Sequence, residues 1–360
     1  MTAAPDPTKA KLDRQLKHAS PLIGCRFDPF GRFLFATAQD CTLQRFDLVT
    51  GAKVAFAGHA SWVRGLAFVP QADELAAHLT VRSELLGLAG GWGALVAPPK
   101  PLPFTVVSGD YHGRLIWWPG EASEPRPIRH VEAHDGWVRA VAASPDGRLI
   151  ASCGNDGLVK LWSAADGSHV RTLEGHGCHV YNLAFHPGGE RLVSADLLGI
   201  VKDWDWQTGE LVRDLDARPL HKYDAGFRAD IGGARGLAFA PDGSRLAVCG
   251  ITNVSNAFAG VGNPLVIAFN WADGKPTQLT PKAGVQGTAW GVALHPLGLV
   301  IAAGGGAGAW VWFWKGDAAA SAHVVALPAS GRDLALHPSG ERFAVAGANG
   351  TAYVYALPPA

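Results

Sequence analysis

Histidine and cysteine are the residues of this 360-residue sequence that could hold a metal or move a proton. The densest group among the fourteen histidines is His176, Cys178 and His179, but a structural zinc site needs four converging ligands, and neighbouring residues of one strand, such as Cys178 and His179, point to opposite faces. No HExxH or GxSxG motif is present, and the glycine-rich run at 304–310 lacks the Lys-Ser/Thr pair of a phosphate-binding loop. We therefore expect no metal, no cofactor and no catalytic residues, and we predict that the protein is not an enzyme.

A short apolar run that ends in a proline turn recurs along the whole chain. The seven prolines are 41, 75, 42, 54, 55 and 42 residues apart, and all but the second are followed two residues later by glycine: Pro29, Pro70, Pro145, Pro187, Pro241, Pro296 and Pro338. Proline fixes φ near −65° and glycine accepts the positive φ that closes a hairpin. Runs such as RLIASCG and RFAVAG, which follow the turns, are typical of strands. Three of the steps match the period of about 40–45 residues of a four-stranded propeller blade.

One stretch carries a complete repeat. Residues 133–162, AHDGWVRAVAASPDGRLIASCGNDGLVKLW, closely resemble one repeat of the WD40 family. In that family a His, a Ser or Thr, an Asp and a Trp form a hydrogen-bonded tetrad within each blade. The resemblance assigns these roles to His134, Ser152, Asp156 and Trp162, and it implies an all-β fold, a seven-bladed β-propeller of four-stranded antiparallel blades.

The tetrad recurs unevenly in the other blades. Parts of it are found in the first half of the chain, at His18, Asp40, His59, Trp118, His176 and Trp204. In blades two and four an aspartate lies two residues early, at Asp110 and Asp196. Blades five to seven lack the histidine, and their Trp position holds Phe269, Trp314 and Tyr355. We expect packing to replace most of the tetrad in the second half.

The two ends of the sequence predict how the ring closes. The chain stops five residues after Tyr355, which leaves no room for the fourth strand of the last blade, whereas residues 12–16 form a spare strand before His18. Pairing of this strand with the last blade would remove an open sheet edge. We therefore expect one domain, residues 1–360, closed by its N-terminal strand.

The three long steps require insertions, which we place at about 71–103, 212–229 and 251–263. The first is expected on the bottom face, either as a flap on its own blade or as a functional loop. The other two flank blade five on the top face. They are expected either to build a recognition ridge or to pack on each other in place of the missing tetrad.

Aromatic and cationic residues of the expected top face are the candidate partner-binding residues. Trp62, Trp137 and His179 each follow a tetrad histidine by three residues, a position at which related propellers often contact peptides, although Trp is also common there by consensus. The remaining candidates lie in the blade-two turn, in blade six and in the second insertion: Tyr111, Trp290, His221, Tyr223, Phe227 and Arg228. Such residue types are enriched at interface hot spots.

The composition limits the partners. Lys and Arg number 31, as do Asp and Glu, so that net charge gives no general reason to bind nucleic acid or a membrane. Five scattered cysteines without CxxC indicate a reducing compartment, and no apolar signal or membrane span is visible. We expect a cytoplasmic, monomeric ring, and the Ala-, Gly- and Pro-rich composition favours a bacterial source.

Two functions remain open. The first is a scaffold that presents top-face loops to a protein or peptide. The alternative is a propeller enzyme or small-molecule binder, with its site at the central channel or under the blade-five loops, where Asp230, His221 and Arg228 would be the first candidates. A pocket that holds two or more of these residues with shifted pKa values would favour the alternative.

Overall fold

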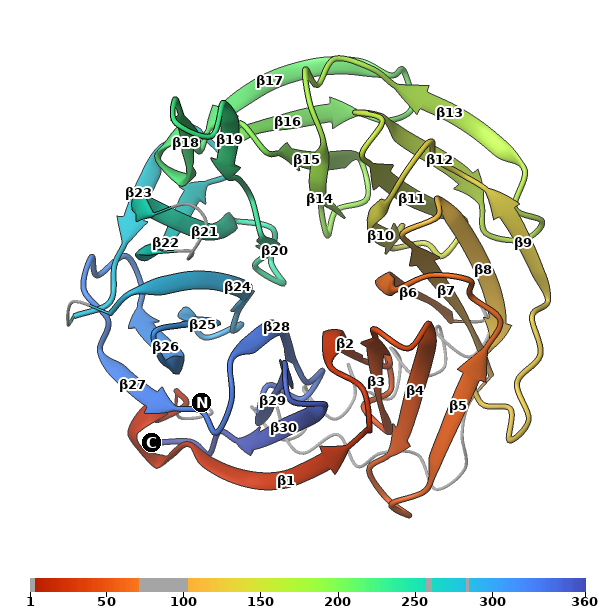
Figure 1. The fold of residues 1–360 in the computed structure, drawn as a ribbon, viewed down its shortest axis with the longest axis horizontal. Helices are drawn as coiled ribbons and strands as arrows, with labels where there is room; N and C mark the ends of the chain where they lie inside the picture. Colours follow the sequence, from red (N-terminus) through yellow and green to blue (C-terminus); the bar gives the residue numbers. More distant parts are fainter. Residues whose placement is uncertain (1–3, 71–102, 257–260, 283–284) are drawn as a thin grey trace.

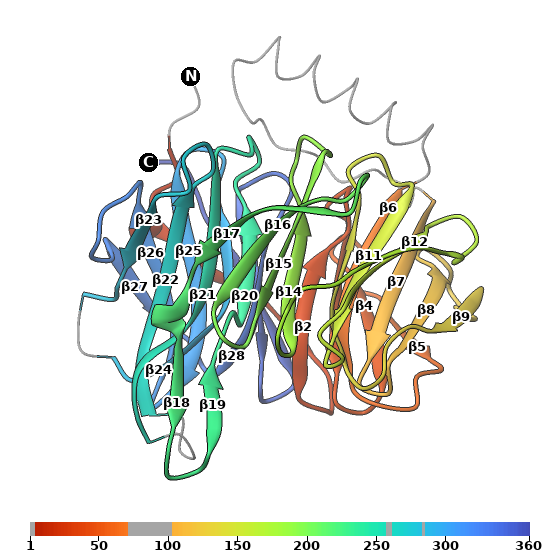
Figure 2. The same cartoon turned by 90° about the horizontal axis from the view of Figure 1, so that it is seen from above.

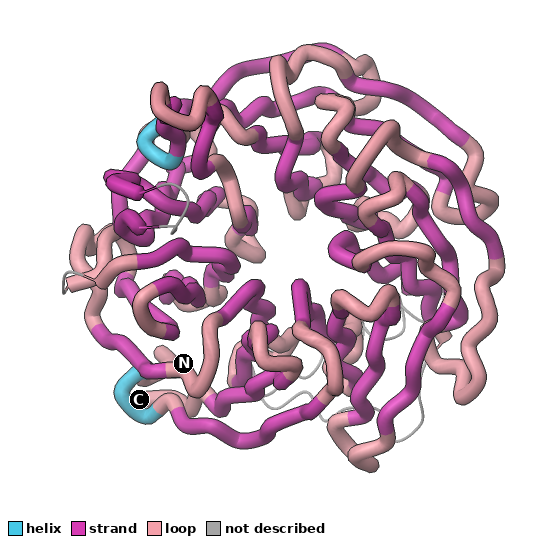
Figure 3. The backbone as a smooth tube through the Cα atoms, in the orientation of Figure 1, coloured by secondary structure: helices cyan, strands magenta, loops and turns pink. Residues whose placement is uncertain are grey.

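The computed structural model describes residues 4–70, 103–256, 261–282 and 285–360, which form seven four-stranded antiparallel sheets arranged in a ring (Figure 1). Almost all regular structure is strand (Figure 3). The prediction of an all-β, seven-bladed propeller is therefore confirmed.

Each blade has an innermost strand at the centre of the ring and an outermost strand at its rim. The innermost strands of blades one to seven are β2 (Leu22–Phe27), β6 (Val63–Pro70), β10 (Val138–Ala143), β14 (Val180–Phe185), β20 (Gly236–Phe239), β24 (Gly287–Leu294) and β28 (Gly331–Leu336). The second strands are β3 (Phe33–Ala38), β7 (Phe104–Asp110), β11 (Leu149–Gly154), β15 (Arg191–Asp196), β21 (Arg245–Asn256), β25 (Leu299–Gly306) and β29 (Arg342–Gly347). The third strands are β4 (Thr42–Asp47), β8 (Arg114–Pro119), β12 (Val159–Ser163), β16 (Ile200–Asp205), β22 (Val261–Asn270), β26 (Ala309–Lys315) and β30 (Thr351–Ala356). The outermost strands are β5 (Lys53–Ala57), β9 (Arg129–Glu132), β13 (His169–Leu173), β17 (Glu210–Asp216), β23 (Pro276–Leu279), β27 (His323–Ala326) and β1 (Lys11–Lys17).

The Pro-x-Gly turns join the first and second strands of six blades. Their glycines have φ between 71° and 84°, and each donates its N–H to the carbonyl three residues earlier: Gly31, Gly147, Gly189, Gly243, Gly298 and Gly340. A side chain is strained at such φ values, which explains why glycine occupies the position. We call the face with these turns the bottom face, and the face with the turns between second and third strands the top face.

The N-terminal strand closes the ring as predicted. β1 pairs antiparallel with β30 from Lys11, opposite Ala356, to Lys17, opposite Thr351. The same pairing continues outside the strands, since Asp6 donates its N–H to the carbonyl of Pro358 at 2.9 Å. The spare strand is slightly longer than the predicted 12–16, and it completes the blade that the C-terminal residues leave one strand short.

The apolar core is divided among the blade interfaces. The described residues form seven buried clusters, and each joins two neighbouring blades. The cluster between blades one and two, for example, packs Phe35 and Phe56 against Phe104 and Trp118. The ring is therefore held together by equivalent apolar contacts between successive sheets.

Two of the three predicted insertions are visible, and both are hairpins. The strand β17 continues to Asp216, so the second insertion begins later than the predicted residue 212; it contains a 3-10 turn, η2 (Arg218–Leu220), and a hairpin of β18 (His221–Asp224) and β19 (Ala229–Gly232) that extends beyond the blades (Figure 2). The third insertion lengthens β21 and β22, which stay paired out to Asn256 and Val261. The insertion predicted at about 71–103, apart from residue 103, lies outside the described residues.

The two visible insertions contact each other. The Lys222 ammonium group on β18 donates to the carbonyl of Val254 on β21.

Helix is limited, among the described residues, to η2 and to η1 (Pro7–Lys9), each of three residues, and neither is long enough to cross a membrane.

Candidate functional site

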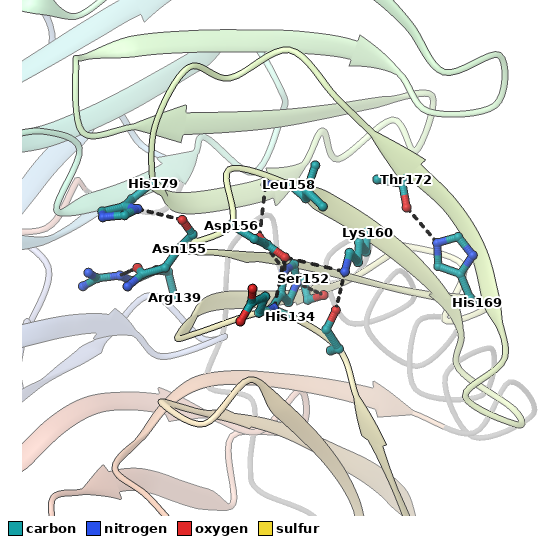
Figure 4. A network of polar contacts seen from close by, with 12 residues as sticks. His134, Arg139, Ser152, Asn155, Asp156, Leu158, Lys160, His169, Thr172 and His179 are labelled. Atoms are coloured by element: carbon teal, nitrogen blue, oxygen red, sulfur yellow. Dashed lines mark hydrogen bonds and ion pairs between the residues drawn. The ribbon is translucent and has the colours of Figure 1, made fainter.

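The tetrad of blade three has the geometry that its sequence predicts, and Figure 4 shows three of its members, His134, Ser152 and Asp156. Ser152 on β11 lies at its centre: the hydroxyl is 2.8 Å from His134 Nε2, and it accepts a hydrogen bond of 2.8 Å from the Trp162 indole. His134 Nδ1 is 2.9 Å from the Asp156 carboxylate. Burial works to raise the pKa of Asp156, but the interactions with His134 and Lys160 hold it below its ordinary value.

Blades two and four contain equally complete tetrads. Asp110 and Asp196, despite lying two residues early, are each 2.8 Å from Nδ1 of their histidines, His59 and His176. The other Asp110 oxygen accepts the N–H of His112, which ties the turn after β7 to the same carboxylate. The offset therefore changes the backbone position of the acid without breaking the network.

The other blades replace the network in part or in full. In blade one His18 pairs with Asp40 at 2.7 Å, but Phe46 stands at the Trp position and offers no N–H. In blade seven Tyr355 stacks on Phe343 with ring centroids 5.1 Å apart. Blade seven thus shows the packing expected in the second half of the chain, whereas in blade six the Trp314 indole still donates to the carbonyl of Thr280 at 3.0 Å.

An Asp, a His and a Ser in hydrogen-bonded series resemble the parts of a hydrolytic site, but here they lie inside the blade. Ser152 is completely buried, and the side chain of His134 is fully enclosed as well. The tetrads join strands and loops inside the blades.

The innermost strands carry a second repeated feature at their top ends. In six of the seven blades the pairing with the second strand skips one residue, which makes a β-bulge, and in blade five Arg235 lies just before β20 at the equivalent place. A bulge turns its side chain away from the regular alternation of the strand. The seven residues at this position are Ile23, Arg64, Arg139, Tyr181, Arg235, Trp290 and Arg332.

These seven side chains line one cavity of about 280 Å³ on the top face, to which all seven blades contribute. We call it the mouth. Trp62 and Tyr111 add aromatic surface on the blade-two side, and none of the described lining residues is acidic. A narrower cavity of about 60 Å³ continues toward the bottom face and is again lined by Arg64, Arg139 and Arg235.

Aromatic rings contact three of the four arginines of the mouth. The Arg139 guanidinium lies 4.4 Å from the ring centroid of Trp137 and 4.5 Å from that of Tyr181. Arg235 lies 4.7 Å from Tyr181 and 5.2 Å from Trp290, which also contacts Arg332 at 5.5 Å. Each such contact is worth about 0.5–2 kcal/mol, depending on how far water is excluded.

Five of the nine predicted partner-binding residues gather at this mouth. Trp62, Tyr111 and Trp290 line it. Trp137 stacks on Tyr111 with centroids 3.9 Å apart and an angle of 4°. His179 lies beside it, because its Nδ1 donates to the carbonyl of Asn155 at 2.7 Å, while the Asn155 side chain accepts from Arg139 (Figure 4). These five residues therefore form one continuous surface.

The other four candidates form a separate group on the β18–β19 hairpin, and none of them lines the mouth: His221, Tyr223, Phe227 and Arg228. His221 pairs with Asp230 of the same hairpin at 2.8 Å. Tyr223 and Phe227 are 55% and 60% exposed. The nine candidates therefore lie on two separate surfaces, the mouth and the β18–β19 hairpin.

Sequence reasoning missed the four arginines and the tyrosine of the mouth: Arg64, Arg139, Tyr181, Arg235 and Arg332. A signal for them is present, because in every blade the bulged position, or its equivalent Arg235 in blade five, lies six residues before the turn proline, as in Arg139 and Pro145. The repeat that predicts the fold therefore also aligns the residues of the mouth.

The positive charges of the mouth oppose one another. Burial lowers the pKa of Arg139 and of Arg235, and the charge of Arg64 lowers both further, while Tyr181 acts in the opposite direction. A ligand that brings negative charge would relieve this repulsion.

Metal ligands do not gather anywhere in the part of the chain that the structure describes, where no three His, Cys, Asp or Glu side chains could hold an ion. Cys178 and His179 precede β14, so our placement of both on one strand was wrong. Burial raises the pKa of Cys178 to about 11, and it raises the pKa of Cys25, Cys153 and Cys249 still further, so these thiols stay protonated at neutral pH.

Comparison with known proteins supports the repeat assignment. Residues 125–163 and 167–205 match the profile of the family described as "WD40: WD domain, G-beta repeat". These segments contain β9 to β12 and β13 to β16, so each repeat begins with the outermost strand of the preceding blade. The same offset leaves β1 to complete the last blade.

Several relatives share short segments with this chain. Small ribosomal subunit protein RACK1y of Oryza sativa subsp. japonica is 38% identical over 78 residues, which are 21% of this chain and 23% of that protein. Small ribosomal subunit protein RACK1z of the same plant is 51% identical over 41 residues, 11% of this chain and 12% of that protein. Ribosome assembly protein 4 of Saccharomyces cerevisiae (strain ATCC 204508 / S288c) is 35% identical over 65 residues, 18% of this chain and 12% of that protein. The chain therefore matches less than a quarter of each of these relatives. Residues 125–163 and 167–205 of this seven-bladed β-propeller therefore match WD40 repeats, in agreement with the complete tetrads of blades three and four.

Proposed function

We propose that this protein is a non-enzymatic scaffold that holds a segment of a partner protein at the mouth of its top face. The observation that supports this most is the mouth itself, where all seven blades contribute to one cavity lined by arginines and aromatic side chains. Arginine, tryptophan and tyrosine are the residues that most often dominate protein interfaces.

The mouth suits a short peptide segment. Its volume lies at the lower limit of ligand pockets, which span about 300–1,000 Å³, so it has room for one or two side chains. Arg139 and Arg235 are held by ring contacts before any partner arrives, which reduces the entropy lost on binding. Exposed Trp62 at its edge offers apolar surface to a neighbouring residue of the segment.

The alternative, an enzyme or a small-molecule site, finds less support. Its first candidates, His221, Arg228 and Asp230, lie on the β18–β19 hairpin and line neither the mouth nor the narrower cavity beneath it. The alternative also includes a small molecule bound at the central channel, and the mouth would still accommodate such a ligand.

Site-specific photo-crosslinking tests the proposal. A photoreactive phenylalanine analogue is introduced at position 62 in the mouth, at position 227 on the hairpin and at position 297 on the bottom face, where Trp62, Phe227 and Leu297 are all exposed. Irradiation in an extract of the source organism is expected to give a discrete protein adduct at position 62 and none at position 297. Adducts only at 297 would refute the proposal, and adducts only at 227 would move the binding surface to the hairpin.

The proposal extends to the number of domains, the location, the oligomeric state and the class of partner. We propose a single-domain, cytoplasmic, monomeric ring with a protein or peptide partner and without nucleic acid or membrane binding. Because the relatives carry ribosomal names, we propose a ribosomal protein as one partner, and mass spectrometry of the adduct would identify it. A bacterial source stays an expectation from composition.

A further inference from the structure

We propose that the mouth recognises a doubly charged anionic side chain, the phosphate group of a phosphoserine or phosphothreonine in the partner segment, through Arg64, Arg139 and Arg235. This inference rests on the proposed function, because it names the chemistry of the segment that the mouth would hold.

The three arginines converge at the passage between the two cavities, both of which they line. Arg64 of blade two reaches across the centre of the ring, where its Nη2 is 3.5 Å from the carbonyl of Arg235 in blade five. The Arg235 Nε is buried and has no hydrogen-bond partner among the described residues. A buried donor without a partner is costly, so an acceptor at this point would be strongly favoured.

The described residues supply no unengaged carboxylate to these three arginines. None of the described residues that line the mouth is acidic, and Asp333 in the lower cavity is already engaged by Arg26 and by the N–H of Cys25. The positive charge that gathers here is therefore left for a ligand to neutralise.

Phosphate fits this arrangement better than a single carboxylate does. A phosphorylated side chain carries a charge of about −1.5 to −2 at pH 7 and presents three acceptor oxygens around one atom. A carboxylate has two oxygens and is saturated by one guanidinium fork, which would leave two of the three arginines unpaired.

The surroundings favour a peptide over a nucleic acid. Proteins that follow a nucleic-acid backbone need an extended positive groove. Here the positive charge is confined to one small cavity in a chain of zero net charge. One anionic group can enter a cavity of about 280 Å³, whereas a chain of phosphates would extend beyond it.

Fluorescence polarisation with defined peptide mixtures tests the inference. The probes are fluorescein-labelled nonapeptide mixtures that are random except for a fixed central phosphoserine, serine or glutamate, with a random RNA dodecamer as the fourth probe. We expect the phosphoserine mixture to bind at least tenfold more tightly than the other three, and millimolar inorganic phosphate to compete with it. Equal binding of the serine and phosphoserine mixtures, or tighter binding of the RNA, would overturn the inference.

Variants assign the binding to the mouth. R139K and R235K keep the charge but lose the bidentate fork, and each is expected to weaken phosphoserine binding at least fivefold; R139Q and R235Q should weaken it further. R148Q is the matched control, because Arg148 is highly exposed beside the bottom-face turn of blade three. Thermal melts verify that each variant is folded. A loss of binding in R148Q equal to that in R139Q would contradict the assignment.

Phosphatase treatment separates this inference from the proposed function. The adduct at position 62 is expected to disappear when the extract is dephosphorylated before irradiation. An adduct that survives dephosphorylation would leave the mouth as the binding surface but refute its recognition of a phosphate group. The absence of any adduct at position 62, with or without phosphatase, would refute the proposed function itself.

Discussion

At the scale of single residues, Ser152 shows how a small polar group can stabilise a blade. Its hydroxyl is buried between the indole N–H of Trp162 and the imidazole of His134, so both ring nitrogens find their partner in one atom. The tetrad could be predicted because all four residue types stand at family spacing. The early aspartates of blades two and four could not be assigned with the same certainty, since spacing alone does not show that Asp110 and Asp196 reach the same Nδ1 position.

Removal of the Ser152 hydroxyl should destabilise the protein. In Ser152→Ala the Trp162 and His134 ring nitrogens lose their buried partner, and the free energy of unfolding is expected to fall by about 1–3 kcal/mol for each group that stays unsatisfied. Trp162→Ala, which truncates a buried aromatic, is expected to cost about 3–5 kcal/mol. Denaturant melts measure both, with exposed Ser123→Ala as the control. A change well under 1 kcal/mol for Trp162→Ala would mean that the indole is not buried in the blade.

The histidines of the His-Pro turns join neighbouring blades. His295 and His337 donate from Nε2 to the carbonyls of Gly340 and Gly31, 3.2 and 2.9 Å away in the next blade, and their Nδ1 atoms accept backbone N–H groups of Leu297 and Ser339. This arrangement requires neutral imidazole. Burial lowers the pKa of both histidines, against the effect of the carbonyls.

Acid should therefore weaken the ring. Because the pKa of each folded-state histidine lies below the unfolded value of about 6.5, the unfolded chain binds more protons as the pH falls. Their stabilising contribution is complete above pH 6.5 and is lost progressively below it, down to the folded-state pKa. The melting temperature is expected to drop between pH 7 and 5, and less so in the double variant His295→Gln and His337→Gln. Equal slopes in wild type and variant would contradict this role.

At the scale of elements, the turns were predictable and the bulges were not. A proline and a glycine two residues later specify a turn by local backbone geometry. A bulge depends on the pairing register of two strands, which the one-dimensional pattern of Val138, Arg139 and Ala140 does not reveal. Regular alternation would have treated Arg139 as an ordinary strand residue, whereas the extra residue directs it into the mouth.

The strand β1 is the element on which ring closure depends. Removal of residues 1–17 would leave β30 as an exposed edge, paired only with β29. We expect the truncated protein to have a lower melting temperature and faster hydrogen exchange in β30, while exchange in β12, in the middle of blade three, changes little. A synthetic peptide of residues 4–19, added in trans, should restore the protection of β30. Unchanged exchange after truncation would show that the ring does not need this strand.

At the scale of the whole molecule, seven similar interfaces generate one central mouth. Each buried cluster joins two blades, so the ring positions the first strands of all seven around one axis. Residues 171 apart in the sequence, such as Arg64 and Arg235, meet there only because the ring is closed. The sequence repeat predicts the ring, but the identity of the mouth becomes visible only when the seven bulged positions are compared side by side.

Hydrogen–deuterium exchange of the protein with and without its captured partner tests the account most directly. Binding at the mouth predicts that protection increases in the top-face segments 61–65, 136–140 and 178–182, while the bottom-face turn at 296–298 keeps its free exchange rate. Protection confined to that turn or to the other bottom-face turns, with no change in the top-face segments, would contradict the claim that the mouth binds the partner.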